Sequence, residues 1–432
     1  MKILLVNPPN CGRSIPEEEY GIDALKMFLR AEPLSLEALA GNLDDHEVKI
    51  VDLKAMPDVY GDVLADFNPD VVGITGVTCE ANTMLKLASE AKKKVRATVV
   101  VGGIHVSGDP DFFNREEIDY IVVGLGKMSF RELISAIETG SPTDIIRGIA
   151  KTKPGSELAF TPRVYCQDDL VEGKAPRYDL VSKYRDHYVL QNFGFGLGLV
   201  STAFGCPHRC SFCCIENATG GRYLTHDPET VIRDIELLDA DISVVRLVDA
   251  NTFGNVVQAR ALCNKIQGKG IQKQFIADVR SDTVVRHPDL FREWRKAGLR
   301  SVIIGFEEID DTKLIAINKA NTTAVNTEAM EILHDMGITI VGDFIISADY
   351  DEQDFQNLRD YLAKHPVGLP MLSILTPLPG TSLYRSMKEK ITIHDLDYYT
   401  LFNAVLPTAI PEKAFYENYA DLLKSGHSGA KI

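Results

Sequence analysis

Short apolar runs alternate with amphipathic stretches along the first third of the chain. Apolar runs bounded by turn residues predict buried strands, and they occur at Lys2–Val6, Val48–Asp52, Asp70–Thr75, Thr98–Gly102 and Asp119–Val123. Apolar residues at helical spacing separate them, at Leu34–Leu43, Glu80–Val95 and Lys127–Glu138. Near-continuous apolar strands separated by helices are typical of a parallel sheet covered on both faces. Residues 1–145 are therefore predicted to form a doubly wound α/β domain.

A second series of such patterns begins near Gly194. Strands are predicted at Leu197–Ser201, Val244–Asp249, Gln274–Val279, Ser301–Gly305, Ile338–Ile345 and Met371–Thr376. Helices are predicted at Pro228–Asp239, Val256–Ile266, Leu290–Ala297, Thr323–Met336 and Glu352–Lys364. This alternation predicts a partial (β/α)6 barrel, similar to part of a TIM barrel, over residues 191–385. Residues 146–190 lack sustained periodicity and are predicted to be a linker, and residues 386–432 a small C-terminal helical tail.

Three cysteines lie within eight residues, directly after the predicted strand Leu197–Ser201. They are Cys206, Cys210 and Cys213, and their place after a strand puts them on a loop at its carboxyl end. Three thiolates satisfy three irons of a cubane 4Fe–4S cluster and leave the fourth iron open, whereas clusters that serve only electron transfer usually have four cysteines. A zinc site with Cys214 as fourth ligand is an alternative, since tetrahedral zinc takes four ligands. Disulfides are a weaker alternative, because the chain has only eight cysteines and no signal peptide.

The remaining cysteines and the overall composition set limits on the function. Cys11, Cys79, Cys166 and Cys263 are scattered along the chain, and we interpret each as an ordinary small buried side chain. The net charge of −15 argues against general binding to nucleic-acid phosphates. No apolar run reaches the roughly 18 residues typical of a transmembrane helix. Free thiols and an oxygen-sensitive cluster favour a reducing cytoplasm.

The three cysteines carry a resemblance to a known superfamily. Their CxxxCxxC spacing, with aromatic Phe212 before the last cysteine, resembles the signature of radical S-adenosylmethionine (SAM) enzymes. The resemblance implies that the open iron chelates the amino and carboxylate groups of SAM. It also implies SAM contacts from Phe212 and from polar residues at the barrel strand ends, where the chain has Asp249, Asp278, Arg280 and Glu307. Carboxylates suit ribose hydroxyls, and an arginine suits the methionine carboxylate.

The first domain resembles the Rossmann-like cobalamin-binding domain that precedes many radical SAM domains. Ligands of doubly wound sheets bind at the carboxyl ends of the strands, where glycine lets the backbone approach a bulky ligand. The resemblance implies cobalamin contacts from Asn7, Pro8, Thr75, Gly102, Gly103, His105, Gly124 and Gly126. For His105, a surface histidine without a ligand is an equal alternative.

Two departures from the cobalamin-binding pattern affect what it implies. The usual Asp-x-His-x-x-Gly is replaced by Asp52–Pro57, where Lys54 stands in place of the histidine, so cobalt would lack a histidine ligand. The end of the fifth strand reads Gly124-Leu-Gly-Lys127 in place of a Gly-Glu-Gly-Glu-like sequence, which puts contacts there in doubt. The segment Leu375–Tyr384 is similar to one shared by cobalamin-dependent radical SAM enzymes, and it makes Tyr384 the candidate catalytic residue.

Together these features resemble the cobalamin-dependent radical SAM methyltransferases, such as the hopanoid methylases and the glutamine C-methyltransferase of methyl-coenzyme M reductase. The resemblance implies three cofactors, namely a 4Fe–4S cluster, SAM and methylcobalamin, and an external electron donor such as flavodoxin or ferredoxin. It implies C-methylation of an unactivated sp3 carbon by way of a 5′-deoxyadenosyl radical, on a peptide or protein residue or a lipid. Ring closure or rearrangement without net methylation is one alternative, and a corrinoid carrier is another.

Overall fold

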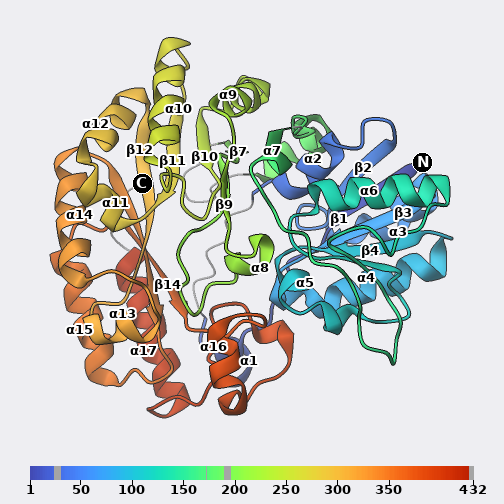
Figure 1. Ribbon diagram of the computed structural model, residues 1–432. Helices are drawn as coiled ribbons and strands as arrows, with labels where there is room; N and C mark the ends of the chain where they lie inside the picture. The colour runs from blue at the N-terminus through green and yellow to red at the C-terminus, as the bar shows by residue number, and fades with distance from the viewer. Residues whose placement is uncertain (24–30, 172, 189–195, 428–432) are drawn as a thin grey trace.

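The computed structural model describes residues 1–23, 31–171, 173–188 and 196–427. Two α/β units make up this structure, with the N-terminal unit at the right of Figure 1 and the larger unit at its left. The predicted start of the second unit at residue 191 lies outside the described residues. Within the described ranges, no helix has the length and apolar composition that crossing a membrane requires.

A six-stranded sheet forms the N-terminal unit, in the order β2-β1-β3-β4-β5-β6. The first five strands pair in parallel, and β6 pairs antiparallel with β5. The strands are β1 (Lys2–Asn7), β2 (Glu47–Asp52), β3 (Val71–Thr75), β4 (Thr98–Gly102), β5 (Tyr120–Val122) and β6 (Ile149–Lys151). The strand order reverses at β1, which places the ligand-binding crevice of a doubly wound sheet beside β1 and β3.

Helices cover both faces of this sheet. One face packs against α3 (Tyr60–Phe67) and α4 (Ala81–Lys94), and the other packs against α2 (Leu34–Gly41) and α6 (Gly126–Thr139) (Figure 1). The shorter elements of the unit are α5 (Ile104–Gly108), α7 (Asp168–Val171), and the 3-10 helices η1 (Pro57–Val59), η2 (Thr78–Glu80), η3 (Pro110–Phe113) and η4 (Tyr178–His187). Helix α1 (Ile15–Tyr20) packs with the second unit, whose core includes Ile15. Strands with apolar residues on both faces are thus buried on both sides, as their sequence predicts.

The second unit is an open barrel of six parallel strands whose spatial order follows the chain, β7-β10-β11-β12-β13-β14. The strands are β7 (Leu197–Val200), β10 (Val244–Leu247), β11 (Gln274–Val279), β12 (Leu299–Glu307), β13 (Thr339–Ile346) and β14 (Leu369–Ile374). The helices outside it are α9 (Pro228–Leu237), α10 (Val256–Gly268), α11 (Ser281–Arg286), α12 (Pro288–Ala297), α13 (Asp311–Ala316), α14 (Thr323–Asp335) and α15 (Glu352–Lys364). This arrangement confirms the predicted fold class.

The C-terminal segment completes the barrel and does not form a separate unit. It consists of α16 (Ser382–Met387), η5 (Lys388–Lys390), η6 (Leu396–Tyr398) and α17 (Glu412–His427). Phe415 packs against Phe355 of α15, with ring centroids 5.3 Å apart. The Tyr419 hydroxyl donates to the Leu372 carbonyl of β14 at 2.9 Å. The aromatic residues of the tail therefore pack α17 against the edge strand β14 and helix α15.

Candidate functional site

The three predicted cluster cysteines lie on a loop that is closed by a small antiparallel sheet. The sheet pairs β8 (Ala203–Gly205) with β9 (Tyr223–Thr225), and α8 (Ile215–Thr219) lies between them in the chain. A Cβ on Gly205 would lie 2.0 Å from the Arg222 carbonyl oxygen, so the two ends of the loop approach this closely only with glycine there. The middle of the loop is fixed by Ser211, whose N–H donates to Ile317 and whose carbonyl accepts from Leu383.

Cys206, Cys210 and Cys213 line one pocket at the carboxyl ends of the barrel strands, which we call the thiol pocket. Its empty volume is about 780 Å³. Burial raises the pKa of the Cys210 thiol and raises that of Cys213 to about 12. Because thiolates are the ligands, iron binding there must displace protons.

The arrangement of the thiols fits a multi-iron cluster. In the described part of the chain, no three His, Cys, Asp or Glu side chains come close enough together to hold one metal ion. A cubane cluster does not need such convergence, since each thiolate binds a different iron. Cys214 does not line the thiol pocket, and it precedes α8 as its N-cap residue. The donor set therefore fits three-cysteine ligation of a 4Fe–4S cluster better than a zinc site with Cys214.

Four of the five predicted SAM contacts line the thiol pocket together with the cysteines, namely Phe212, Asp278, Arg280 and Glu307. Arg280 is buried, and its Nε donates to Asp282 at 2.9 Å. Asp278 pairs with Arg246 at 2.9 Å. The polar side chains are thus held in defined positions by ion pairs within the pocket wall.

Lys319 and Asp343 are among the charged residues of this wall that sequence reasoning missed. The Lys319 ammonium pairs with Glu307 at 2.6 Å. Burial, with smaller contributions from Glu307 and Asp278, raises the pKa of Asp343 to about 7. A signal for Asp343 was available, since it is a carboxylate inside the otherwise apolar strand β13.

Asp249, the fifth predicted SAM contact, is not among the residues that line the thiol pocket. Its carboxylate accepts hydrogen bonds from the N–H groups of Thr202 and Ala203, both at 2.8 Å. It also accepts from the hydroxyls of Ser201 at 3.2 Å and Thr202 at 2.6 Å. Asp249 therefore anchors the backbone between β7 and β8, and SAM binding by this residue stays a prediction.

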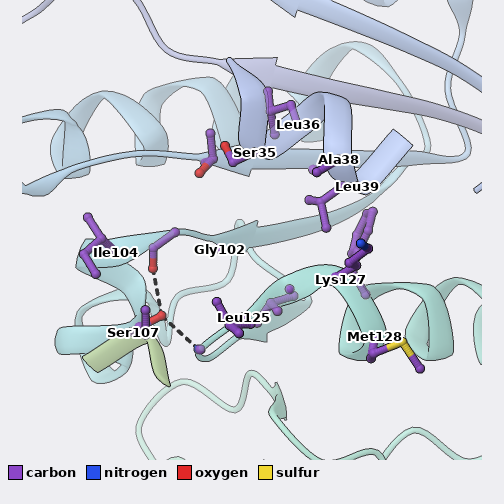
Figure 2. Close-up of a pocket in the computed structure, with 18 of the residues that line it drawn as sticks. Ser35, Leu36, Ala38, Leu39, Gly102, Ile104, Ser107, Leu125, Lys127 and Met128 are labelled. Atoms are coloured by element: carbon purple, nitrogen blue, oxygen red, sulfur yellow. Dashed lines mark hydrogen bonds between the residues drawn. The ribbon is translucent and has the colours of Figure 1, made fainter. Parts of the chain in front are cut away.

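A larger and mainly apolar pocket lies at the carboxyl ends of the N-terminal sheet (Figure 2). It has an empty volume of about 1140 Å³, and five of the predicted cobalamin contacts line it: Thr75, Gly102, Gly103, Gly124 and Gly126. We call it the glycine pocket. Gly103 has a φ of 116°, and a Cβ there would lie 2.8 Å from the Thr75 hydroxyl, so both its conformation and its surroundings require glycine.

The geometry of the glycine pocket fits a large, mainly apolar group with polar edges. Ser107 joins two of its loops, since its hydroxyl donates to the Gly103 carbonyl at 2.8 Å and accepts from the Gly124 N–H at 2.9 Å (Figure 2). Gly73, which also lines the pocket, lets the Leu5 side chain pack closely against its strand, because a Cβ there would lie 3.0 Å from Leu5. Cobalamin, with its macrocycle and aromatic base, is a group of this kind.

The other three predicted cobalamin contacts do not line the glycine pocket. The Asn7 side chain donates to Asp52 at 2.8 Å, and Pro8 is buried behind the end of β1. His105 is 2% exposed, so the alternative of a surface histidine is wrong. Its ring packs edge-on against Phe112 and Phe113, and neither ring nitrogen has a hydrogen-bond partner.

Two further predictions concern Lys54 and Tyr384. The Lys54 ammonium pairs with Glu80 at 2.8 Å and lies outside the glycine pocket, and no histidine is among the described residues that line it. Tyr384 packs against Ile391 and Leu406 and lines neither pocket.

The four scattered cysteines were predicted to be buried. Cys263 is buried, Cys11 and Cys79 are partly buried, and Cys166 is exposed, so the prediction is wrong for Cys166.

One short helix belongs to the walls of both pockets. Ile215 and Glu216 of α8 line the thiol pocket, and Ala218, on the same helix, lines the glycine pocket. Phe204, two residues before the first cluster cysteine, also lines the glycine pocket. In Figure 1, α8 lies between the N-terminal unit and the barrel. The two pockets are therefore neighbours, separated by the segment that carries the cysteines.

Comparison with known proteins agrees with this division of the chain. The B12 binding domain matches residues 22–134, and the radical SAM superfamily matches residues 200–362. The hopanoid C-3 methylase of Methylococcus capsulatus is 27% identical over 402 residues, which cover 90% of this chain and 75% of the methylase. An anaerobic magnesium-protoporphyrin IX monomethyl ester cyclase of Rubrivivax gelatinosus is 26% identical over 364 residues, which cover 81% of this chain and 63% of the cyclase.

A solved structure shows the same fold over the full chain. It is that of the radical SAM methyltransferase TsrM from Kitasatospora setae, with cobalamin and a 4Fe–4S cluster bound. The two structures superpose with a TM-score of 0.76 at 18% identity, covering 100% of this chain and 92% of TsrM. Two domain matches, two pockets that fit the corresponding cofactors and one shared fold agree: the chain combines a B12 binding domain with a radical SAM domain, and it is similar to radical SAM methyltransferases.

Proposed function

We propose that this protein methylates an unactivated sp3 carbon by radical chemistry, with cobalamin as the methyl donor. The observation that carries this proposal is the wall that α8 contributes to both pockets. A radical and a methyl donor must reach the same substrate carbon, and positioned reactants need near-contact distances. Two neighbouring pockets meet that requirement.

The cofactors supply the difficult chemistry, since SAM at a reduced cluster gives a 5′-deoxyadenosyl radical and methylcobalamin gives the methyl group. The residues of the chain position these groups and exclude water. In the thiol pocket, Arg280 offers a guanidinium to the SAM carboxylate, and Asp278 and Glu307 offer acceptors for its ammonium and hydroxyl groups. Apolar Phe204 and Ala218 shield the adjoining side of the glycine pocket.

A second candidate is ring closure or rearrangement without net methylation. The similarity to the anaerobic cyclase favours it, because that similarity also spans most of this chain. The third possibility, a corrinoid carrier, requires no SAM pocket beside the glycine pocket, and the shared helix argues against it.

The substrate remains a proposal of two classes, a lipid or a peptide or protein residue. The similarity to a hopanoid methylase favours the lipid. We further propose a one-electron donor, such as flavodoxin or ferredoxin, as the partner that reduces the cluster.

The test is a product analysis of anaerobically reconstituted protein with methylcobalamin, SAM, a reductant and candidate substrates of both classes. Methylation predicts two SAM consumed per methylated product, with S-adenosylhomocysteine and 5′-deoxyadenosine formed in equal amounts. A cyclase would form 5′-deoxyadenosine and a product without added methyl carbon. A carrier would form neither nucleoside, and that result would overturn the proposal.

A further inference from the structure

One cationic side chain in the mainly apolar glycine pocket has no partner among the described residues. Among the residues that line this pocket, the charged ones are Asp169 and Lys127. Asp169 accepts from the Cys166 N–H at 2.7 Å and lies 3.6 Å from Arg163. Lys127 forms no hydrogen bond and no ion pair within 4 Å in the part of the chain that the structure describes.

Lys127 stands at the positive end of a helix that has no acidic residue near it. It is the second residue of the 14-residue helix α6, whose first turn contains no Asp or Glu. The N-cap residue, Leu125, provides no side-chain acceptor for the free N–H groups of that turn. Gly126, Lys127 and Met128 all line the glycine pocket, and Figure 2 shows Lys127 and Met128 beside it. The ammonium and the helix end therefore bring positive charge to the same part of the wall.

The positive charge of Lys127 raises the free energy of the folded protein when no anion is bound beside it. Burial lowers the pKa of Lys127, and the positive Arg233 and Arg131 lower it further, against an attraction from Asp234. Asp234 already accepts from Arg233 at 2.8 Å, so it does not need Lys127 as a partner. A partly buried cation without a hydrogen-bonded counter-ion is unfavourable, and a bound anion in the pocket would relieve the cost.

Cobalamin carries one anionic group of the required kind. Its corrin side chains are neutral amides, and the phosphodiester that joins the corrin to the nucleotide base is negatively charged. We propose that Lys127, together with the first turn of α6, binds this phosphodiester and so makes the pocket select the complete cofactor over corrinoids without the nucleotide. The inference rests on cobalamin as the occupant of the pocket and does not depend on the reaction.

The test compares two ligands, cobalamin and cobinamide, which lacks the phosphodiester and the base. Their dissociation constants are measured by equilibrium dialysis with the full-length, cluster-loaded protein. Loss of one hydrogen-bonded charge pair predicts that Lys127→Met binds cobalamin about 10- to 100-fold more weakly. Its affinity for cobinamide should stay within about twofold of wild type, and Lys127→Arg should preserve most of the discrimination, because it keeps the charge.

Lys86→Met is the matched control, since Lys86 is an exposed lysine of α4 in the same unit and does not line the glycine pocket. An equal loss of both ligands in Lys127→Met would overturn the inference and assign the lysine a role in joining the units near Asp234. Unchanged cobalamin binding would also overturn it. Wild-type protein that binds neither ligand would instead contradict cobalamin as the occupant.

Discussion

His105 is a buried histidine without any hydrogen-bond partner for its ring. It lies two residues after the predicted diglycine contact, yet it faces Phe112 and Phe113 and not the glycine pocket. Burial lowers its pKa to about 4. The ordinary histidine pKa is about 6.5, so the unfolded chain binds a proton at this position more readily than the folded protein does.

The stability of the protein should therefore fall in mild acid. Between about pH 6.5 and pH 4, protonation of His105 favours the unfolded state by roughly 1.4 kcal/mol per pH unit, and the loss levels off below pH 4. Denaturant titrations at pH 6.5 and pH 5 should show a smaller acid loss for His105→Leu than for wild type. His226 contributes to the acid-induced loss of stability in both wild type and His105→Leu, because burial also lowers its pKa to about 4. His334→Leu, at an exposed site on α14, should behave as wild type.

The thiol pocket makes a prediction for each cysteine of the loop. Alanine at Cys206, Cys210 or Cys213 should remove one of only three iron ligands, and iron content and 5′-deoxyadenosine formation should then be lost. Cys214→Ala should keep both, since Cys214 does not line the pocket. Iron analysis and product assays under anaerobic conditions measure the effect. Iron loss in Cys214→Ala alone would contradict the ligand assignment.

At the scale of single residues, the type of residue was a better guide to the candidate site than any expectation about which groups its side chain contacts. Cysteines and glycines carry their function in their chemistry or in their lack of a side chain, so the loop cysteines and the pocket glycines were predictable from the sequence. Polar side chains such as Asn7 and Asp249 were not, because each is consumed by a partner from a distant segment. Only the fold determines whether such a group faces a ligand or another residue.

Among the elements, the entrance to the cluster loop depends on Asp249. Four hydrogen bonds join its carboxylate to the backbone and hydroxyls between β7 and β8. Asp249→Asn weakens these bonds, and hydrogen bonds to a charged group contribute about 1.5–3 kcal/mol. We expect a lower thermal midpoint and less iron retained after gel filtration. Asp241→Asn, at an exposed position, is the control.

SAM affinity separates the two roles of Asp249. An anchor predicts that the fraction of Asp249→Asn that keeps its cluster binds SAM almost normally, as measured by equilibrium binding. Full iron retention with weakened SAM binding would instead support the direct contact predicted from the sequence.

Long periodic elements were predicted well, and short ones were not. The prediction for α4 differs from the structure by one residue at each end. By contrast, β6 has only three residues and lies in the stretch predicted as a linker, yet it extends the N-terminal sheet. A strand this short has too few positions to show alternation, and its pairing with β5 provides the stabilisation that its own sequence does not indicate.

At the scale of the whole molecule, two glycines form a contact between the N-terminal unit and the barrel. A Cβ on Gly380 would lie 2.6 Å from the Gly108 Cα, and Gly380 also has a φ of 85°. Gly108 ends α5, which packs against α8, and Gly380 precedes α16. Backbone approaches backbone here, so a larger side chain can be accommodated only if the two units move apart.

Gly380→Ala should therefore uncouple the two pockets without emptying either one. We expect 5′-deoxyadenosine formation within about twofold of wild type, and methylated product reduced by up to the order of 100-fold, because small displacements of positioned reactants have large effects. Gly140→Ala is the control: Gly140 also has a positive φ, of 67°, but a Cβ there meets no atom within 4 Å. Equal loss of both products in Gly380→Ala would mean general damage and contradict the proposed contact.

The position of α8 in both pocket walls has a consequence for the assembly of the enzyme. If the iron cluster orders the segment before α8, it also completes the wall against which the corrin binds, so protein without iron should hold cobalamin more weakly. Thermodynamic linkage makes this effect reciprocal, and cobalamin should raise the equilibrium affinity of the protein for iron by the same factor. Dialysis of cobalamin from iron-free and iron-loaded protein measures one side of the cycle, and the equilibrium partition of iron between the protein and a competing chelator measures the other. Cells short of either nutrient would then accumulate enzyme that retains the other cofactor poorly.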